Sequence, residues 1–197
     1  MGALRNWLAA GLVGLGALSV AAPDVAAQEL PFAGVIDEVR VGIHAHEVHW
    51  SLWPVHVRDW DLSQIGDVSF DVLFTSPDHD VFRWIGSPRP EIGTTLTFTG
   101  EESLLHAGLT WQLPVFDTPV FLEGTFGAAV HNGYLTGAPA GRRNMGCRIN
   151  FYERFGIGVN ISENATALLT YEHTSNAELC DANDGLSNFG VRVGFKF

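Results

Sequence analysis

The sequence is poor in basic residues. Its 197 residues contain 11 lysines and arginines against 22 aspartates and glutamates, so the formal net charge is −11. Proteins that bind nucleic acid present a basic face, because each phosphate contact calls for a cationic or hydrogen-bonding partner. The charge balance therefore argues against a nucleic-acid partner.

After residue 27 the chain also lacks any hydrophobic run approaching the 18 or so apolar residues that a membrane-spanning helix needs. Before that point, Arg5 precedes an uncharged apolar run over residues 8–22, and Val25-Ala26-Ala27 supplies small residues for a cleavage site. This pattern is typical of a Sec-type signal peptide. We expect a signal peptide over residues 1–27 and one domain over residues 28–197, so any membrane role must come from strands.

Cysteine is scarce as well, with only Cys147 and Cys180. Two cysteines in an exported chain usually form a disulfide. We predict that these two are paired.

Apolar residues in the chain instead alternate with polar or small residues, with a period of two. Eight segments of roughly ten residues, separated by turn residues, each carry one apolar face and one polar or small face. The clearest is the last, whose apolar face consists of Phe189, Val191, Val193, Phe195 and Phe197.

Eight such segments match an antiparallel barrel that crosses a bilayer, since a closed sheet satisfies its backbone hydrogen bonds in lipid. A soluble barrel turns its apolar face inward, and a membrane barrel turns it outward. Charged residues on the polar faces and the terminal Phe197 favour the membrane. We predict an all-β, eight-stranded antiparallel up-and-down transmembrane barrel, integral to the outer membrane of a Gram-negative bacterium; a soluble lipid-binding barrel is the alternative.

With both termini in the periplasm, the connections near residues 48–63, 100–103, 132–146 and 176–187 become extracellular. The Pro-rich connection from Ser76 to Pro90 becomes periplasmic. Trp50, Trp53 and Trp60 then fall at the outer rim, where indoles prefer the interface. Cys147 and Cys180 come out on the same side. Glu153 interrupts an apolar face, which a bulge or an interfacial position would explain.

The most informative stretch is His173-Thr174-Ser175-Asn176. Residues two apart on a strand share a face with Cα atoms roughly 6.5 Å apart, so the His173 imidazole could take the hydroxyl proton of a Ser175 nucleophile. Asn176 begins the next loop, where its amide or nearby backbone N–H groups could stabilise an oxyanion. Ala165, Ala167 and Leu169 continue the same face, which puts the pair on the outer wall.

Residues 173–177, His-x-Ser-Asn-Ala, followed by Asn183-Asp184-Gly185 resemble the outer-membrane lipid A 3-O-deacylases of the PagL type and their acyloxyacyl hydrolase relatives. The resemblance implies that His173 is the general base, Ser175 the nucleophile and Asn176, with adjacent backbone groups, the oxyanion hole. It implies hydrolysis of the 3-linked acyl ester of lipid A in lipopolysaccharide, without a metal or organic cofactor. The sequence is compatible with a monomer or a homodimer.

The sequence departs from that family at Ser187, where members carry an acidic residue that orients the histidine. A serine can hold a tautomer but brings no charge. Glu178, Asp181 or Asp184 could substitute from the loop, whereas Glu172 should point into the barrel. Ser187 keeps open the alternative of a non-catalytic structural or adhesive barrel.

His44 and His46 share a strand face and could chelate a metal ion. No spacing fixes a third or fourth ligand. We therefore expect both histidines to join Glu38, Arg40 and His106 in a hydrogen-bonded barrel interior.

Overall fold

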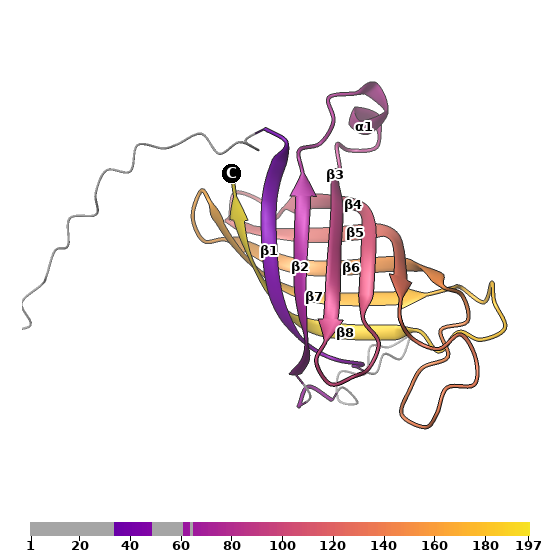
Figure 1. Cartoon of the computed structure of the whole chain (residues 1–197). Helices are drawn as coiled ribbons and strands as arrows, with labels where there is room; N and C mark the ends of the chain where they lie inside the picture. The colour runs from indigo at the N-terminus through magenta and orange to yellow at the C-terminus, as the bar shows by residue number, and fades with distance from the viewer. Residues whose placement is uncertain (1–33, 49–60, 64) are drawn as a thin grey trace, which may run out of the picture.

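The computed structural model describes residues 34–48, 61–63 and 65–197. Here the chain forms an antiparallel barrel in which each strand pairs with the next and β8 closes onto β1 (Figure 1). The predicted eight-stranded antiparallel barrel is confirmed. The strands are β1 (Ile36–Ala45), β2 (Ile65–Phe74), β3 (Arg89–Thr97), β4 (Leu104–Pro114), β5 (Val120–His131), β6 (Ile149–Asn160), β7 (Ala165–Ser175) and β8 (Leu186–Lys196).

The expected signal peptide over residues 1–27 and the tryptophans Trp50, Trp53 and Trp60 lie outside the described residues.

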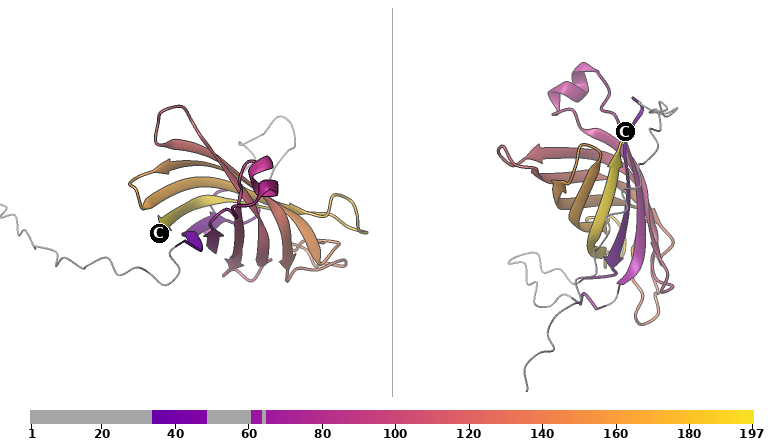
Figure 2. Two further views of the ribbon diagram at one scale, coloured as in Figure 1. Left: turned by 90° about the horizontal axis from the view of Figure 1, so that it is seen from above. Right: turned by 90° about the vertical axis from the view of Figure 1, so that its left-hand side faces the viewer.

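The two ends of the barrel differ. The C-terminus and the β2–β3 connection lie at one end, and the β5–β6 and β7–β8 loops lie at the other (Figure 1). The view from above in Figure 2 shows the β7–β8 loop projecting opposite the C-terminus. This arrangement puts the segment after His173 and Ser175 at the end with the long loops.

The β2–β3 connection contains a short helix, α1 (Asp80–Trp84), that the sequence did not predict. Arg83 pairs with Asp78 and Asp80 next to and within the helix, and Trp111 of β4 donates to the carbonyl of Ile85 at the helix end at 2.8 Å. A five-residue helix is too short to show a helical period, which is why alternation and turn residues did not reveal it. Among the described residues, no helix is long and apolar enough to span a membrane.

The barrel interior is polar and closely paired. Arg40 Nη1 lies 2.6 Å from Glu123 Oε1, and Arg192 Nε lies 2.9 Å from Asp71 Oδ2. All four side chains are buried. Buried charges are tolerated only when they are paired and hydrogen-bonded, so this network accounts for the charged residues on the polar strand faces.

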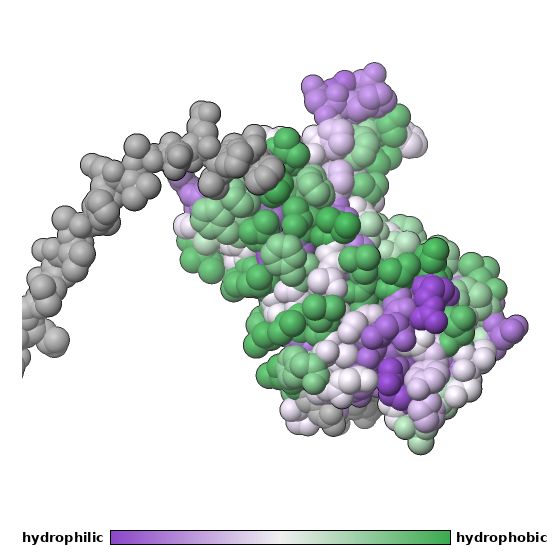
Figure 3. All heavy atoms as spheres, in the orientation of Figure 1, coloured by the Kyte–Doolittle hydropathy of each residue, from purple (hydrophilic) through white to green (hydrophobic). Residues whose placement is uncertain are grey.

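The outer wall is apolar, as Figure 3 shows on the face it presents. Large hydrophobic side chains on every strand are a third or more exposed. They include Val41, Ile43, Phe70, Ile92, Leu105, Leu122, Phe126, Phe155, Ile157, Leu169, Val191, Val193 and Phe195. A polar interior inside an apolar wall is the inverse of a soluble ligand barrel and matches a membrane barrel. The predicted orientation of the two faces is confirmed.

Candidate active site

The structure brings His173 and Ser175 together at the loop end of β7, on the outer face of the barrel. Both side chains are partly exposed, while Thr174 between them is buried inside. Glu172 also points inward, as predicted, and accepts a hydrogen bond from Arg192 at 2.6 Å. The two-residue spacing therefore places the imidazole and the hydroxyl on one outward-facing row.

This row lines a half-open pocket of about 470 Å³ in the barrel wall. Its floor comes from β6, β7 and β8, and its rim comes from the loops. The lining residues are Val48, Arg143, Glu153, Phe155, Tyr171, His173, Ser175, Asn183, Asp184, Gly185, Leu186 and Ser187. The pocket is a mixture of apolar and polar groups, as an ester with an acyl chain requires.

His173 is held from β8. Its Nδ1 lies 2.8 Å from the Oγ of Ser187, which is its direct partner in the β7–β8 register. The hydroxyl of Tyr171 donates to the same Oγ at 2.7 Å. When Nδ1 carries the proton and donates it to Ser187, Nε2 is the nitrogen with the lone pair. This is the tautomer a general base needs.

The loop acids considered as substitutes for the orienting acid bond elsewhere. Asp184 Oδ2 accepts from the backbone N–H of Asn144 at 2.7 Å, and Glu178 Oε1 accepts from Asn183 at 3.1 Å. In the part of the chain that the structure describes, neither these two nor Asp181 hydrogen-bonds to His173. Ser187 is thus the residue that holds the ring.

Gly185 leaves room for the imidazole. Its φ is 68°, a left-handed conformation, and a Cβ built on it would lie 3.1 Å from Cε1 of His173. A side chain there would be strained and would crowd the ring. The Asn-Asp-Gly turn therefore serves the site directly.

Glu153 is a site residue that the sequence did not assign. It sits on the outer face of β6, directly opposite His173 in the β6–β7 register, and lines the same pocket. Its Oε2 is buried and has no hydrogen-bond partner among the described residues. Side chains opposite each other across antiparallel strands have Cβ atoms about 5 Å apart. A carboxyl group thus lies across from His173 on the side away from Ser187.

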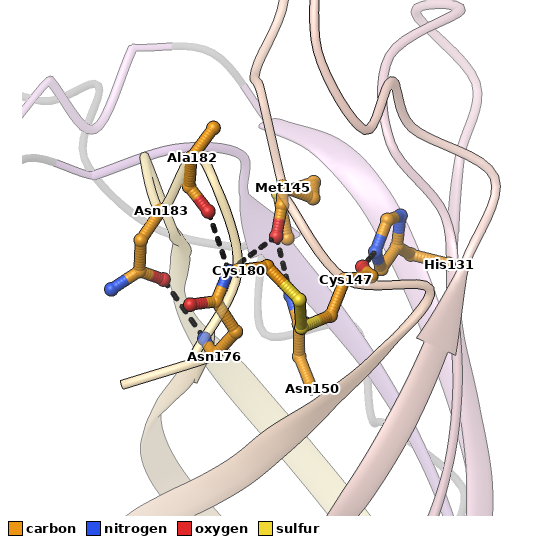
Figure 4. The surroundings of a disulfide bond; sticks show 8 residues. All are labelled: His131, Met145, Cys147, Asn150, Asn176, Cys180, Ala182 and Asn183. Carbon is orange, nitrogen blue, oxygen red and sulfur yellow. Dashed lines mark hydrogen bonds between the residues drawn. A yellow bond between two sulfur atoms is a disulfide. The ribbon is translucent and has the colours of Figure 1, made fainter. Parts of the chain in front are cut away.

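Asn176 lies just below the surface of the loop, where all its N–H groups are engaged (Figure 4). Its side-chain Nδ2 donates to the carbonyls of Met145 at 2.9 Å and Ala182 at 2.6 Å. Its backbone N–H donates to Asn183 Oδ1 at 2.8 Å. Asn176 therefore ties the β5–β6 loop to the β7–β8 loop, and a direct contact with an oxyanion would require one of these bonds to break.

The predicted disulfide is confirmed. Cys147 and Cys180 are bonded, with Cα atoms 5.6 Å apart, beside the Asn176 contacts (Figure 4). The bridge joins the end of the β5–β6 loop to the β7–β8 loop. It thus fixes the loop that carries Asn183, Asp184 and Gly185 over the pocket.

The chain is similar to proteins of known family and fold. The family model described as "Lipid A 3-O-deacylase (PagL)" matches residues 48–196. No curated protein sequence matches the chain.

Two solved structures share the fold. The crystal structure of the outer-membrane enzyme PagL aligns with a TM-score of 0.53 and 16% identity, over 81% of this chain and 99% of that one. Neisserial surface protein A (NspA) aligns with a TM-score of 0.52 and 11% identity, over 81% of this chain and 96% of that one. At these sequence identities the structural similarity shows only the barrel fold.

Proposed function

The chain belongs to the PagL family of lipid A 3-O-deacylases, and we propose that it hydrolyses the 3-linked acyl ester of lipid A at its outer wall. The observation that carries the proposal is the shared outward row of His173 and Ser175 in a half-open pocket. Exposed apolar side chains of the wall, such as Leu169 and Phe155, continue from it. An acyl chain in the outer leaflet would lie against this surface with its ester beside Ser175.

The reaction follows from a serine paired with a histidine. Ser175 Oγ attacks the acyl carbonyl carbon while its proton passes to Nε2 of His173. The tetrahedral intermediate then collapses, and the imidazolium returns the proton to the departing sugar oxygen. Water activated by the same imidazole hydrolyses the acyl-enzyme and regenerates the serine. The scheme uses no metal or organic cofactor.

We assign the oxyanion hole to Asn176 together with neighbouring backbone N–H groups. Because the Asn176 donors bind Met145, Ala182 and Asn183, we propose that its main contribution is to fix the loop. Ala177, next in sequence, has a φ of 53°. A left-handed residue reorients the following peptide, so the backbone here can turn N–H groups toward Ser175.

The imidazolium formed during the reaction needs a nearby negative charge, which Ser187 lacks. We propose that Glu153 supplies it from β6. Its position opposite His173 in the shared pocket supports this assignment. Ser187 and Tyr171 then orient the ring while Glu153 stabilises its charged form as a positioning residue.

We further propose that the protein is integral to the outer membrane of a Gram-negative bacterium, after removal of residues 1–27. The apolar wall, the polar interior and the disulfide of an exported chain support this location. The loop end would face the exterior, so the pocket would open toward the leaflet that contains lipopolysaccharide.

A non-catalytic surface barrel is the second candidate. It is favoured by the neutral Ser187 in place of the orienting acid and by the shared fold with NspA. The two functions differ in whether an ester bond is broken.

Incubation of the detergent-purified protein with purified lipid A tests the proposal. We expect mass spectrometry to show loss of one hydroxyacyl group with wild type and none with Ser175→Ala. Unchanged lipid A with correctly folded wild-type protein would favour the non-catalytic barrel.

A further inference from the structure

A second cluster of ionisable side chains lies at the loop end of the barrel, outside the pocket of His173 and Ser175. His46 and Glu47 follow β1, and Glu101 and Glu102 lie between β3 and β4. Ligand atoms of His46, Glu47 and Glu101 all lie within 4.8 Å of one another. His46 Nε2 is 3.8 Å from Glu101 Oε2 and 3.9 Å from Glu102 Oε2.

Two of the converging atoms are buried without a partner. His46 Nε2 and Glu102 Oε2 form no hydrogen bond among the described residues, and their side chains are 2% and 1% exposed. Buried polar atoms are nearly always paired, so two that face each other across a gap call for something between them. Their separation is too long for a hydrogen bond.

The ring of His46 is also oriented as it would be in a metal ligand. Its Nδ1 lies 2.9 Å from Asp67 Oδ2, and Asp67 is fully buried. A histidine that binds a metal through one ring nitrogen usually donates the other N–H to a carboxylate, which fixes the ring and its tautomer. The sequence predicts that His44 and His46 both join the hydrogen-bonded barrel interior, and His44 does so, with its Nε2 2.9 Å from Ser69 Oγ.

We propose that His46, Glu101 and Glu102, with Glu47 at the open side, bind a divalent transition metal ion of the zinc or manganese class. Tetrahedral zinc sites place ligand atoms roughly 3.4 Å apart, so the distances from His46 Nε2 to Glu101 and Glu102 would have to shorten by about half an ångström. The imidazole ligand disfavours calcium and magnesium, which prefer all-oxygen shells.

A proton on the His46 imidazole would compete with the metal ion for Nε2. Burial disfavours a charged ring, but the carboxylates of Asp67 and Glu102 outweigh it and raise the pKa of His46 to about 9. A protonated Nε2 would still lie beyond hydrogen-bond distance of both glutamates. A metal ion would satisfy both carboxylates and the nitrogen at once.

Charges around the cluster leave room for a cation. Arg142 Nε donates to Glu102 Oε1 at 2.8 Å, and Arg143 pairs with Glu47. These contacts use one oxygen of each glutamate. By contrast, both acids of the second close cluster, Asp71 and Glu91 inside the barrel, are paired with arginines, whereas Glu101 has no arginine partner among the described residues.

Binding of the metal does not depend on the proposed deacylation, and the test measures it directly. The protein is purified in detergent, stripped with a chelator and titrated with zinc or manganese chloride by calorimetry. Calcium and magnesium chloride serve as comparisons. We expect one saturable site for zinc or manganese and at least tenfold weaker binding of the other two ions.

The variants identify the site. His46→Asn and Glu102→Gln should each weaken binding at least tenfold, and Asp67→Asn should weaken it 10- to 100-fold through the orientation of His46. The control is Glu163→Gln, which removes an exposed carboxylate at the other end of the barrel and should leave binding unchanged. Heat-dependent gel migration shows that each variant is folded. No saturable binding, or full binding in both folded His46→Asn and Glu102→Gln, would overturn the proposal.

Discussion

Ser187 Oγ lies 2.8 Å from Nδ1 of His173, on the outer face where β7 and β8 run side by side. The contact orients the imidazole without lending it charge.

Ser175→Ala and His173→Ala should each abolish deacylation and leave the barrel folded. Both side chains are on the outer wall, so truncating them breaks none of the interior ion pairs. Loss of a nucleophile or its base usually costs several orders of magnitude in rate. Product formation is followed by mass spectrometry. Ser162→Ala and His79→Ala, exposed at the opposite end, are matched controls; wild-type rates in both site variants would refute the assignment.

Ser187→Glu should raise the rate by about tenfold or more, because an acid beside Nδ1 stabilises the imidazolium as well as the tautomer. Tyr171 can donate to the new carboxylate as it now donates to Ser187. The comparison variant is Ser187→Ala, which should lower the rate because the ring loses its anchor. A Ser187→Glu protein no faster than wild type would show that charge on this side is not limiting.

Much of this fold could be predicted from alternation alone, because side chains of a strand change face at every residue. The faces of the last segment, from Phe189 to Phe197, agree with the exposed row on β8. Contacts between strands were harder to predict. The partner of Glu153 depends on the β6–β7 register, which the sequence of neither strand specifies. A charge that seemed to spoil an apolar face thus turned out to lie beside His173.

The loops show the same limit. Asn176 was predicted at the start of the right loop, but its donors bind carbonyls of Met145 and Ala182. The first of these is 31 residues away in the sequence, and only the folded loops bring the two together. Proximity in the sequence therefore located the site but did not specify the hydrogen bonds.

Asn176→Ala should destabilise the protein by about 1–3 kcal/mol, because two side-chain hydrogen bonds are lost and the Ala182 carbonyl loses its donor, while the Met145 carbonyl keeps a hydrogen bond from Asn150. It should also lower the deacylation rate through disorder of the loop. Urea unfolding in detergent and lipid A assays measure the two effects. A large loss of activity with unchanged stability would instead favour a direct oxyanion contact.

Replacing both Cys147 and Cys180 with serine should lower the free energy of unfolding by roughly 3–4 kcal/mol, since the bridge closes a long loop in the unfolded chain. Activity should fall as well, because Gly185 and Asp184 are on the tethered loop. Reduction of the wild-type disulfide should reproduce both effects. Free thiols in the oxidised, denatured protein would contradict the pairing.

Glu153→Gln tests whether the carboxylate on β6 supplies the missing charge. The substitution keeps the size of the side chain, so the folded barrel and the KM should change little. The kcat should fall about tenfold or more, because the imidazolium in the transition state loses the acid that lies opposite His173 on β6.

The double variant Glu153→Gln with Ser187→Glu separates charge from shape. If Glu153 acts by its charge, an acid on the β8 side should restore the kcat that Glu153→Gln removes, although it stands on the opposite side of His173. The two substitutions should then be strongly non-additive. If the role of Glu153 is purely structural, Glu153→Gln should lower the kcat by the same factor in the wild-type protein and in the Ser187→Glu variant. That result would contradict a role of the Glu153 charge in the mechanism.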